Sequence, residues 1–150
     1  MRRAAGILFA AYEALVLWLL FGQREPLAED YWACVAANCN LIPLRSIAEF
    51  VQDLIRPESY GVFRFAVVQI LGNVIMFLPL GFFLPLLFHG IRTYLRLLLL
   101  SVIIVTGIEL VQLFTLLGSC DIDDLILNTV GVSLGYAGYC FLRRIHWGRL

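Results

Sequence analysis

The sequence predicts an all-α integral membrane protein, a bundle of four transmembrane helices with a short amphipathic helix in the first extracytoplasmic loop. Hydrophobic residues make up 61% of the 150 residues and charged residues 15%, whereas soluble domains are about 25% charged and 45–50% apolar. The mean hydropathy is +0.89. A soluble domain of this length has too little interior for so many large apolar side chains. Composition therefore excludes an ordinary soluble enzyme, a disordered chain and a secreted disulfide miniprotein.

Four apolar stretches are long enough to cross a bilayer, which takes about 20 residues per helix. We place them at about 4–22, 62–84, 94–117 and 123–142, within a single membrane domain over 1–150. The first stretch is expected to be a retained helix and not a cleaved signal peptide, because its apolar part is too long and Glu13 interrupts it. In the second stretch, Pro79 predicts a kink and leaves the carbonyl of Ile75 without its helical partner.

The arginines set the predicted orientation, since all 11 cations are Arg and cytoplasmic loops carry the excess of Lys and Arg. The side with both termini would carry Arg2, Arg3, Arg92, Arg96, Arg143, Arg144 and Arg149. The other side would carry Arg24, Arg45, Arg56 and Arg64, diluted by acidic residues in the same loop. Both termini are therefore predicted to be cytoplasmic, with the long loop 23–61 and the short turn 118–122 outside.

The long outer loop contains a predicted amphipathic helix. Ser46 and Glu49 have the spacing of a capping box, in which each side chain binds the backbone N–H of the other residue. The apolar residues that follow recur at helical spacing, and Pro57 ends the pattern. Such a helix either lies on the membrane surface with its apolar face in the interface or packs against the bundle, and the sequence supports both arrangements.

Polar residues occur inside the spans, where an ionisable side chain costs about 2.5–3.5 kcal/mol on insertion scales. Three groups lie toward the outer ends of the second, third and fourth spans: Gln69 with Asn73, Glu109 with Gln112, and Asp121 with Asp124 and Asn128. Within each group the spacing puts the side chains on one helix face, which indicates a polar pocket that opens outward. Structural alternatives remain open, because Asp121 could cap a helix start and Asn73 could join two helices. A buried Glu109 must pair with a cation or stay protonated.

Three further residues are assigned to helix packing. They are Pro79 in the second span and Gly131 and Gly135 in the fourth. The two glycines form a small-xxx-small pattern, which lets a neighbouring helix approach closely, and they continue the face that carries Asp124 and Asn128. We therefore expect the polar end of the fourth span to face the bundle and not the lipid.

The sequence carries no pattern for a metal, a cofactor or a nucleic acid. Its net charge is zero, whereas nucleic-acid binding takes a clustered basic excess. The four cysteines include no Cys-x-x-Cys pair, so no zinc site is expected. A disulfide among Cys34, Cys39 and Cys120, which all fall in outer segments, stays open. No Ser-His-Asp order, phosphate loop or nucleotide fingerprint occurs.

Four segments together resemble the VanZ-like family of small bacterial membrane proteins. They are NLIP (40–43), NVIMFLPLGF (73–82), ELVQ (109–112) and DIDDLILNTVG (121–131). One departure is the turn Gly118-Ser119-Cys120, where members of the family often place an Arg, so a cation that balances Glu109 would be Arg45 or Arg64. The resemblance implies the bacterial cytoplasmic membrane and an association with resistance to glycopeptide antibiotics, chiefly teicoplanin, or with cell-envelope homeostasis, but it implies no reaction.

We expect an extracytoplasmic pocket that contacts a ligand or partner without carrying out chemistry. Its residues are Asn40, Asn73, Glu109, Gln112, Asp121, Asp123, Asp124 and Asn128. The expected partners are the lipid bilayer and either a lipid-linked cell-wall precursor or an envelope protein, with a homo-oligomer also open. Two alternatives are a proton-coupled transporter, because intramembrane carboxylates mark proton relays, and a hydrolase or transferase in which Glu109 acts with Asp123 or Asp124.

Overall fold

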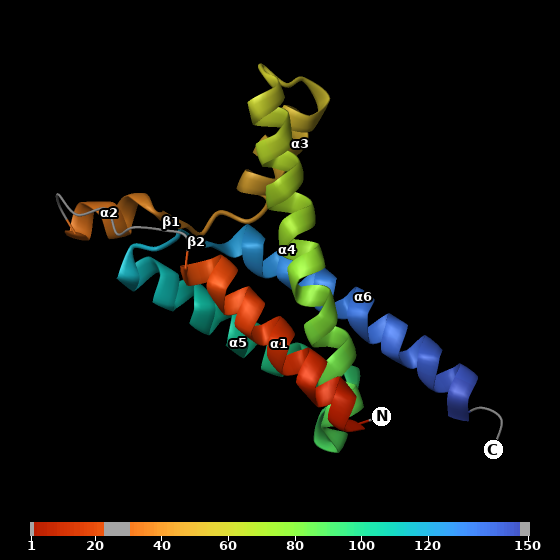
Figure 1. Cartoon of the computed structure of the whole chain (residues 1–150). Coiled ribbons are helices and arrows are strands. Elements are labelled where there is room, and N and C mark those ends of the chain that lie inside the picture. Colours follow the sequence, from red (N-terminus) through yellow and green to blue (C-terminus); the bar gives the residue numbers. More distant parts are fainter. Residues whose placement is uncertain (1, 23–30, 148–150) are drawn as a thin grey trace.

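The computed structural model describes residues 2–22 and 31–147, and it is mostly helical (Figure 1). Its elements are α1 (Arg2–Phe21), α2 (Tyr31–Ala37), β1 (Cys39–Asn40), α3 (Arg45–Ile55), α4 (Tyr60–Leu87), the 3-10 turn η1 (His89–Ile91), α5 (Tyr94–Thr115), β2 (Cys120–Asp121) and α6 (Ile122–Trp147). Four helices, α1, α4, α5 and α6, are long and apolar enough to cross a membrane, which confirms the predicted fold class. Arg24 and Arg149, which contributed to the charge count, lie outside the described residues.

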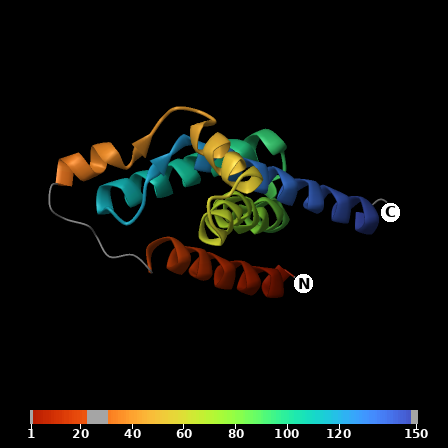
Figure 2. The ribbon, with the colours of Figure 1, turned by 90° about the horizontal axis from the view of Figure 1, so that it is seen from above.

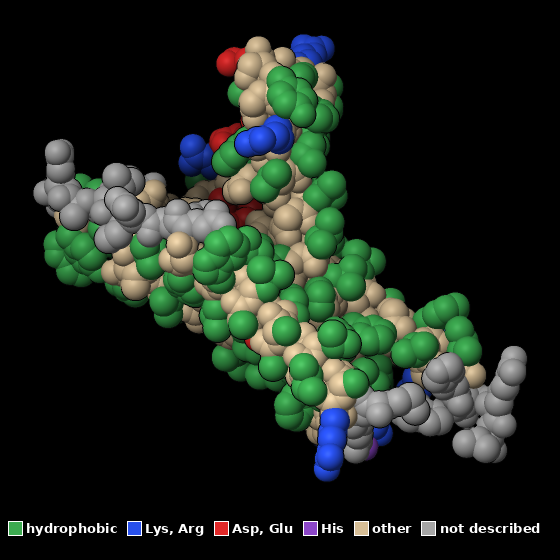
Figure 3. Space-filling view, viewed as in Figure 1, with side chains coloured by type: hydrophobic (Ala, Val, Ile, Leu, Met, Phe, Trp, Pro, Cys, Tyr) green, Lys and Arg blue, Asp and Glu red, His purple; other side chains and the backbone are tan. Residues whose placement is uncertain are grey.

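The surface of these long helices is largely apolar. Figure 3 shows hydrophobic side chains over much of the visible face, and the exposed ones include Ile7 and Trp18 on α1, Phe65 on α4 and Ile103 on α5. Soluble monomers rarely expose large continuous apolar patches. The protein therefore sits in a lipid bilayer, with these side chains facing the lipid.

Helix α4 is the central element of the bundle. Figure 2 shows α4 nearly end-on, with α1 on one side of it and α5 and α6 on the other, and its most extensive contact is with α6. The buried core of this region consists of Phe77, Leu80, Leu84, Leu97, Val105 and Val132. Because lipid tails are as apolar as these side chains, close packing and not hydrophobic burial has to hold the helices together.

Glycines bring α6 into backbone contact with α4. A methyl group at Gly131 would overlap the carbonyl of Val74, and a methyl group at Gly135 would overlap the carbonyl of Leu78. Gly81 on α4 meets the backbone of α6 in the same way. The two helices thus interlock through small residues from both sides, and this contact places the polar start of α6 beside α4.

Pro79 lies inside α4, and the helix continues beyond it to Leu87. The Tyr12 hydroxyl on α1 donates to the carbonyl of Met76 at 2.6 Å. Met76 is next to Ile75, whose carbonyl loses its helical donor to the proline. A neighbouring helix thus supplies a donor beside the point where proline interrupts the backbone ladder, as membrane helices commonly do.

The outer loop contains the predicted amphipathic helix, but this helix begins differently from the prediction. Helix α3 spans Arg45–Ile55 and packs against α4. Its N-cap is Leu44, whose φ of 66° is in the left-handed region. Ser46 therefore lies in the first turn and not at the cap, and its hydroxyl donates to Asp121. The predicted capping box between Ser46 and Glu49 is wrong. The first N–H groups of α3 instead bind the carboxylate of Asp123, which is distant in the sequence.

Two very short strands join the outer loop to the turn between α5 and α6. Strands β1 and β2 pair in parallel, with Cys39 opposite Cys120 and Asn40 opposite Asp121. The sequence does not predict these strands, because two-residue strands show no periodicity of hydrophobic residues. Their pairing brings the NLIP and DIDD segments together, although the two segments are far apart in the sequence.

Candidate functional site

Asp123 caps helix α3 from a position 76 residues away in the sequence. Its carboxylate oxygens accept the backbone N–H groups of Leu44 and Ile47, the latter at 3.0 Å. The residue is 1% exposed, and hydrogen bonds to an ionised carboxylate are stronger than neutral ones. Since each oxygen binds a backbone amide at the start of α3, Asp123 anchors this helix to α6.

Asp121 connects the same loop to α5 and α6. Its carboxylate accepts from the Ser46 hydroxyl, from Asn40 Nδ2 at 3.2 Å and from the N–H of Asp123 at 2.9 Å. Its own N–H donates to Glu109 Oε2 at 3.2 Å. We refer to Asn40, Ser46, Asp121 and Asp123 as the outer latch, after the orientation that the arginines predict, because these side chains fasten the loop that contains α3 to the start of α6.

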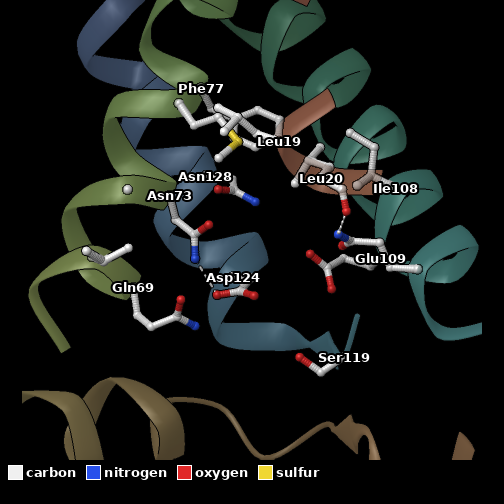
Figure 4. A pocket seen from close by; sticks show the side chains of 14 residues that line it. Leu19, Leu20, Gln69, Asn73, Phe77, Ile108, Glu109, Ser119, Asp124 and Asn128 are labelled. Atoms are coloured by element: carbon white, nitrogen blue, oxygen red, sulfur yellow. Dashed lines mark hydrogen bonds between the residues drawn. The ribbon is translucent and has the colours of Figure 1, made fainter. Parts of the chain in front are cut away.

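Next to the outer latch, helices α1, α4, α5 and α6 surround a cavity of about 210 Å³ (Figure 4). Its apolar wall includes Leu19, Leu20, Val68, Met76, Phe77 and Ile108. Its polar wall consists of Gln69, Asn73, Glu109, Gln112, Ser119, Asp124 and Asn128. These residues lie toward the helix ends that meet the outer loop and the α5–α6 turn, so the cavity is at the latch end of the bundle.

Two amide side chains of the polar wall are oriented by the protein itself. Asn73 Nδ2 donates to Asp124 Oδ1, and Gln112 Nε2 donates to the carbonyl of Leu20 at 3.3 Å; Figure 4 draws both bonds as dashed lines. A carbonyl and an ionised carboxylate can only accept, so each amide turns its nitrogen toward that partner. Both bonds join different helices, and they therefore hold the walls of the cavity together.

Asn128 has a buried side-chain oxygen that no described residue satisfies. The residue is 3% exposed and lines the cavity. Its Oδ1 has no hydrogen-bond partner among the residues that the structure describes. A buried acceptor without a partner costs about 1–3 kcal/mol. Among the described residues, this acceptor therefore lowers the stability of the packed interior beside the cavity.

The eight residues that the sequence suggested for one pocket fall into two groups in the structure. Asn73, Glu109, Gln112, Asp124 and Asn128 line the cavity. Asn40, Asp121 and Asp123 belong to the outer latch and do not line the described cavity. The two groups are adjacent, because the N–H of Asp121 donates to Glu109.

Three groups of the site and its latch do not follow from the sequence pattern: Ser119, Ser46 and the carbonyl of Leu20. Ser119 lies in the α5–α6 turn and lines the cavity, and its position beside the acidic segment was the one signal available. The spacing of Ser46 and Glu49 predicts a cap for Ser46 and no contact with Asp121. The contribution of Leu20 comes from its backbone, and no side-chain pattern reveals a backbone acceptor.

The cations proposed to balance the acids lie elsewhere. Arg45 Nε pairs with Glu49 at 3.2 Å on the exposed side of α3. Within residues 2–22 and 31–147, Arg64 forms no ion pair with an acid. In the same ranges, no three His, Cys, Asp or Glu residues are grouped so that they could hold a metal ion.

The outer cysteines are free thiols in the structure, although two of them are neighbours. Cys39 and Cys120 are opposite each other in β1 and β2, and Cys34 lies in α2 and is also free. Desolvation, followed by the neighbouring Cys39, raises the pKa of the Cys120 thiol to about 11. Since the thiolate is the reactive form, Cys120 is not suited to act as a nucleophile at neutral pH.

A protein-family model described as VanZ/LLP1 matches residues 9–143. No curated protein and no solved structure matches the chain. The matched range contains every residue of the outer latch and every residue that lines the cavity.

Proposed function

Because the chain belongs to the VanZ/LLP1 family of multi-pass membrane proteins, we propose that it acts in the bacterial envelope by binding a lipid-linked or cell-wall ligand in the cavity. The observation that carries this proposal is the polar wall of the cavity, where carboxylate and amide side chains from α4, α5 and α6 converge. Polar groups within membrane helices are costly and are typically functional. Here they gather around space that can hold a ligand.

The size of the cavity limits the part of the ligand that can enter. Its volume of about 210 Å³ is below the roughly 300–1,000 Å³ of pockets that hold drug-sized ligands. A headgroup of a few polar atoms fits, whereas a whole glycopeptide antibiotic does not. We therefore propose that the protein contributes to teicoplanin resistance by binding an envelope component and not by enclosing the drug.

In the proposed orientation both termini are cytoplasmic, and the outer latch and cavity face the outside of the cell. This orientation is supported by the arginines at the opposite end of the bundle. Arg92 directly follows η1, and Arg96 lies in the first turn of α5. Arg143 and Arg144 lie near the end of α6. Such an excess of Arg is typical of the cytoplasmic side.

Binding accounts for the site better than catalysis does. A mechanism with paired carboxylates needs acids of different pKa that are free to exchange protons. Asp123 is occupied by the N–H groups of Leu44 and Ile47. The raised pKa of Cys120 removes the neighbouring thiol as a nucleophile at neutral pH.

Proton-coupled transport is the second candidate, and Glu13 is the observation that favours it. Glu13 lies within α1, and its Oε1 is buried without a hydrogen-bond partner among the described residues. Intramembrane carboxylates often serve in proton relays. Purified protein in liposomes that carry a pH gradient tests this candidate: proton flux that Glu13→Gln abolishes would support transport, and flux equal to that of empty liposomes would exclude it.

Expression in a glycopeptide-susceptible bacterium tests the proposed function. The chain should raise the concentration of teicoplanin needed to stop growth. Asp124→Ala and Asn73→Ala should abolish this increase at an unchanged protein level, because they remove polar groups from the cavity wall. Glu49→Ala, on the exposed side of α3, is the control and should keep it. Unchanged susceptibility with well-expressed protein contradicts the proposal.

A further inference from the structure

We infer that Cys39 and Cys120 form a disulfide bond on the extracytoplasmic side, and that this bond locks the outer latch. The inference goes beyond the proposed ligand binding and uses only the proposed orientation. It is carried by the register of the two short strands, which puts the two cysteines side by side, and by the contact of the neighbouring pair in the same strands. Both cysteines are free thiols in the structure, which is therefore the reduced form of the pair.

The register of β1 and β2 brings the two backbones to the separation that a disulfide needs. Cys39 and Cys120 are direct partners across the parallel pair, and the N–H of Cys120 donates to the carbonyl of Asn38 at 2.8 Å. Neighbouring strands lie about 4.8 Å apart, and the Cα atoms of a disulfide are usually about 4.4–6.8 Å apart. The bond can therefore form without a large movement of the backbone.

The next pair in the same register shows that paired side chains meet in this small sheet. Asn40 is opposite Asp121, and its Nδ2 donates to Asp121 Oδ1 at 3.2 Å. Successive side chains of a strand point to opposite faces, so Cys39 and Cys120 lie together on the other face. The two thiols also interact, since the Cys39 side chain contributes, after desolvation, to the raised pKa of Cys120.

The other two cysteines are placed differently. Cys34 lies in α2, and Cys140 lies in α6 toward the opposite end of the bundle. Neither of them faces a cysteine across the described strands. In the proposed orientation Cys39 and Cys120 lie outside the cytoplasm, where disulfides form and persist, whereas the cytosol keeps thiols reduced. Register and location thus single out one pair.

Oxidation of the pair requires an electron acceptor, and the one we assign is the disulfide of an extracytoplasmic thiol oxidoreductase. The thiolate of the exposed Cys39 attacks this disulfide, which forms a mixed disulfide and releases one donor sulfur as a thiol. Cys120 then gives up its proton and attacks the Cys39 sulfur, and the second donor sulfur leaves. The two cysteines lose two electrons and two protons, and the donor takes up these electrons and protons as it becomes a dithiol. Cys120 carries little thiolate at neutral pH, but its place beside Cys39 makes the second attack intramolecular and so favours it.

The bond fastens the outer latch covalently. It closes a loop of about 80 residues and ties together the two strands that set Asn40 against Asp121. Ser119, the residue before Cys120, lines the cavity, and the N–H of Asp121 donates to Glu109. The disulfide therefore also fixes the segment at the latch end of the cavity. Alkylation of Cys120 is possible only in the reduced protein.

Disulfide mapping in the full chain tests the inference. The chain is expressed in a bacterium that has an extracytoplasmic disulfide-forming oxidoreductase, and the cells are quenched with acid. Free thiols are then blocked with N-ethylmaleimide in denaturant, and the protein is digested without reductant. Mass spectrometry should find the peptide of Cys39 linked to that of Cys120 in most of the protein, and dithiothreitol should separate them. N-ethylmaleimide on both cysteines in most of the protein overturns the inference, as does linkage of either one to Cys34 or to a second chain.

Cys39→Ser and Cys120→Ser should each abolish the linked peptide, and Cys34→Ser is the matched control. Cys34 is the third cysteine of the outer segments, and it has the same chemistry without a cysteine opposite it in the described strands. Its replacement should leave the linkage unchanged. Loss of the linkage in Cys34→Ser at an unchanged protein level contradicts the inference, because Cys34 would then take part in the exchange.

The melting temperature measures whether the bond locks the latch. Purified oxidised protein in detergent should melt at least about 4 °C above the same protein reduced with a phosphine, because the cross-link restricts the unfolded chain. Cys39→Ser should melt at the same temperature with and without the reductant. Equal melting temperatures of the oxidised and reduced wild type overturn the locking role.

Oxidised glutathione, added to the purified reduced protein, separates the geometry of the pair from the orientation of the chain. Linkage in the purified protein but not in cells overturns the extracytoplasmic disulfide and contradicts the proposed orientation. Absence of linkage in both overturns the inference alone. The proposed ligand binding then stands if Asp124→Ala still abolishes the teicoplanin effect, because that binding does not use the cross-link.

Discussion

Asn73 on α4 donates its side-chain amide to Asp124 on α6, across the same interface where Gly131 meets the backbone of α4. The hydrogen bond forms because the two helix backbones approach closely, and small residues are what permits this approach in a membrane. The packing of α4 on α6 and the polar wall of the cavity are thus one structural feature. A change that separates the two helices should also open the cavity.

Gly131→Ala should destabilise the protein by about 1–3 kcal/mol, the usual cost of overpacking a close contact. The added methyl group would overlap the carbonyl of Val74, so α6 would have to move away from α4. The melting temperature in detergent measures this loss. Gly107→Ala on α5 is the control, because a Cβ there meets nothing within 4 Å. Equal melting temperatures for the two variants would show that the α4–α6 contact is looser than described.

Asp123→Ala should destabilise the outer loop by at least about 2 kcal/mol. It leaves the N–H groups of Leu44 and Ile47 without their acceptor, and hydrogen bonds to charged groups contribute about 1.5–3 kcal/mol each. Amide hydrogen exchange should speed up at the start of α3, and the melting temperature should fall. Glu49→Ala removes an exposed ion pair with Arg45 and should cost less than about 1 kcal/mol. Unchanged exchange in Asp123→Ala would mean that α3 does not depend on this cap.

Alkylation of Cys120 should be slow at pH 8 and should keep accelerating as the pH rises. Its pKa is raised from the ordinary 9.0 to about 11, so the neutral thiol is favoured. At pH 8 the thiolate fraction of Cys120 is then roughly 100-fold lower in the folded protein than in the unfolded chain. The rate of Cys120 alkylation should increase about tenfold per pH unit up to about pH 10. Mass spectrometry of alkylated peptides from folded and denatured protein measures both rates. A rate that levels off below pH 10 contradicts the raised pKa.

The long helices could be predicted from the sequence because their signals are local. Hydropathy over about 20 residues identifies a span, and apolar residues at helical spacing identify α3. The Gly131 and Gly135 spacing is equally local, and it indicated which face of α6 could approach another helix. Each of these features depends on neighbours within a few turns of one helix.

The roles of the acids could not be predicted in the same way, because distant segments determine them. Asp121 and Asp124 are three positions apart, which suggested one helix face, but Asp121 lies in β2 and binds Asn40 and Ser46. Asp123 replaces the expected capping box of α3 because the β1–β2 pairing brings it to Leu44. Spacing shows which residues share a helix face and does not show which loop will pair with them.

The orientation of the chain is tested by two cysteine substitutions in a variant without the native cysteines. Glu58→Cys lies in the outer loop and Gly90→Cys lies in η1 at the opposite end of α4, and both positions are exposed. A membrane-impermeant maleimide should label Glu58→Cys in intact cells, and Gly90→Cys only after the membrane is opened, because the arginines favour a cytoplasmic η1. Labelling of both in opened cells controls for reactivity. The reverse pattern would place the cavity of Asn73 and Asn128 on the cytoplasmic side, away from the cell wall, and would contradict the proposed extracytoplasmic site.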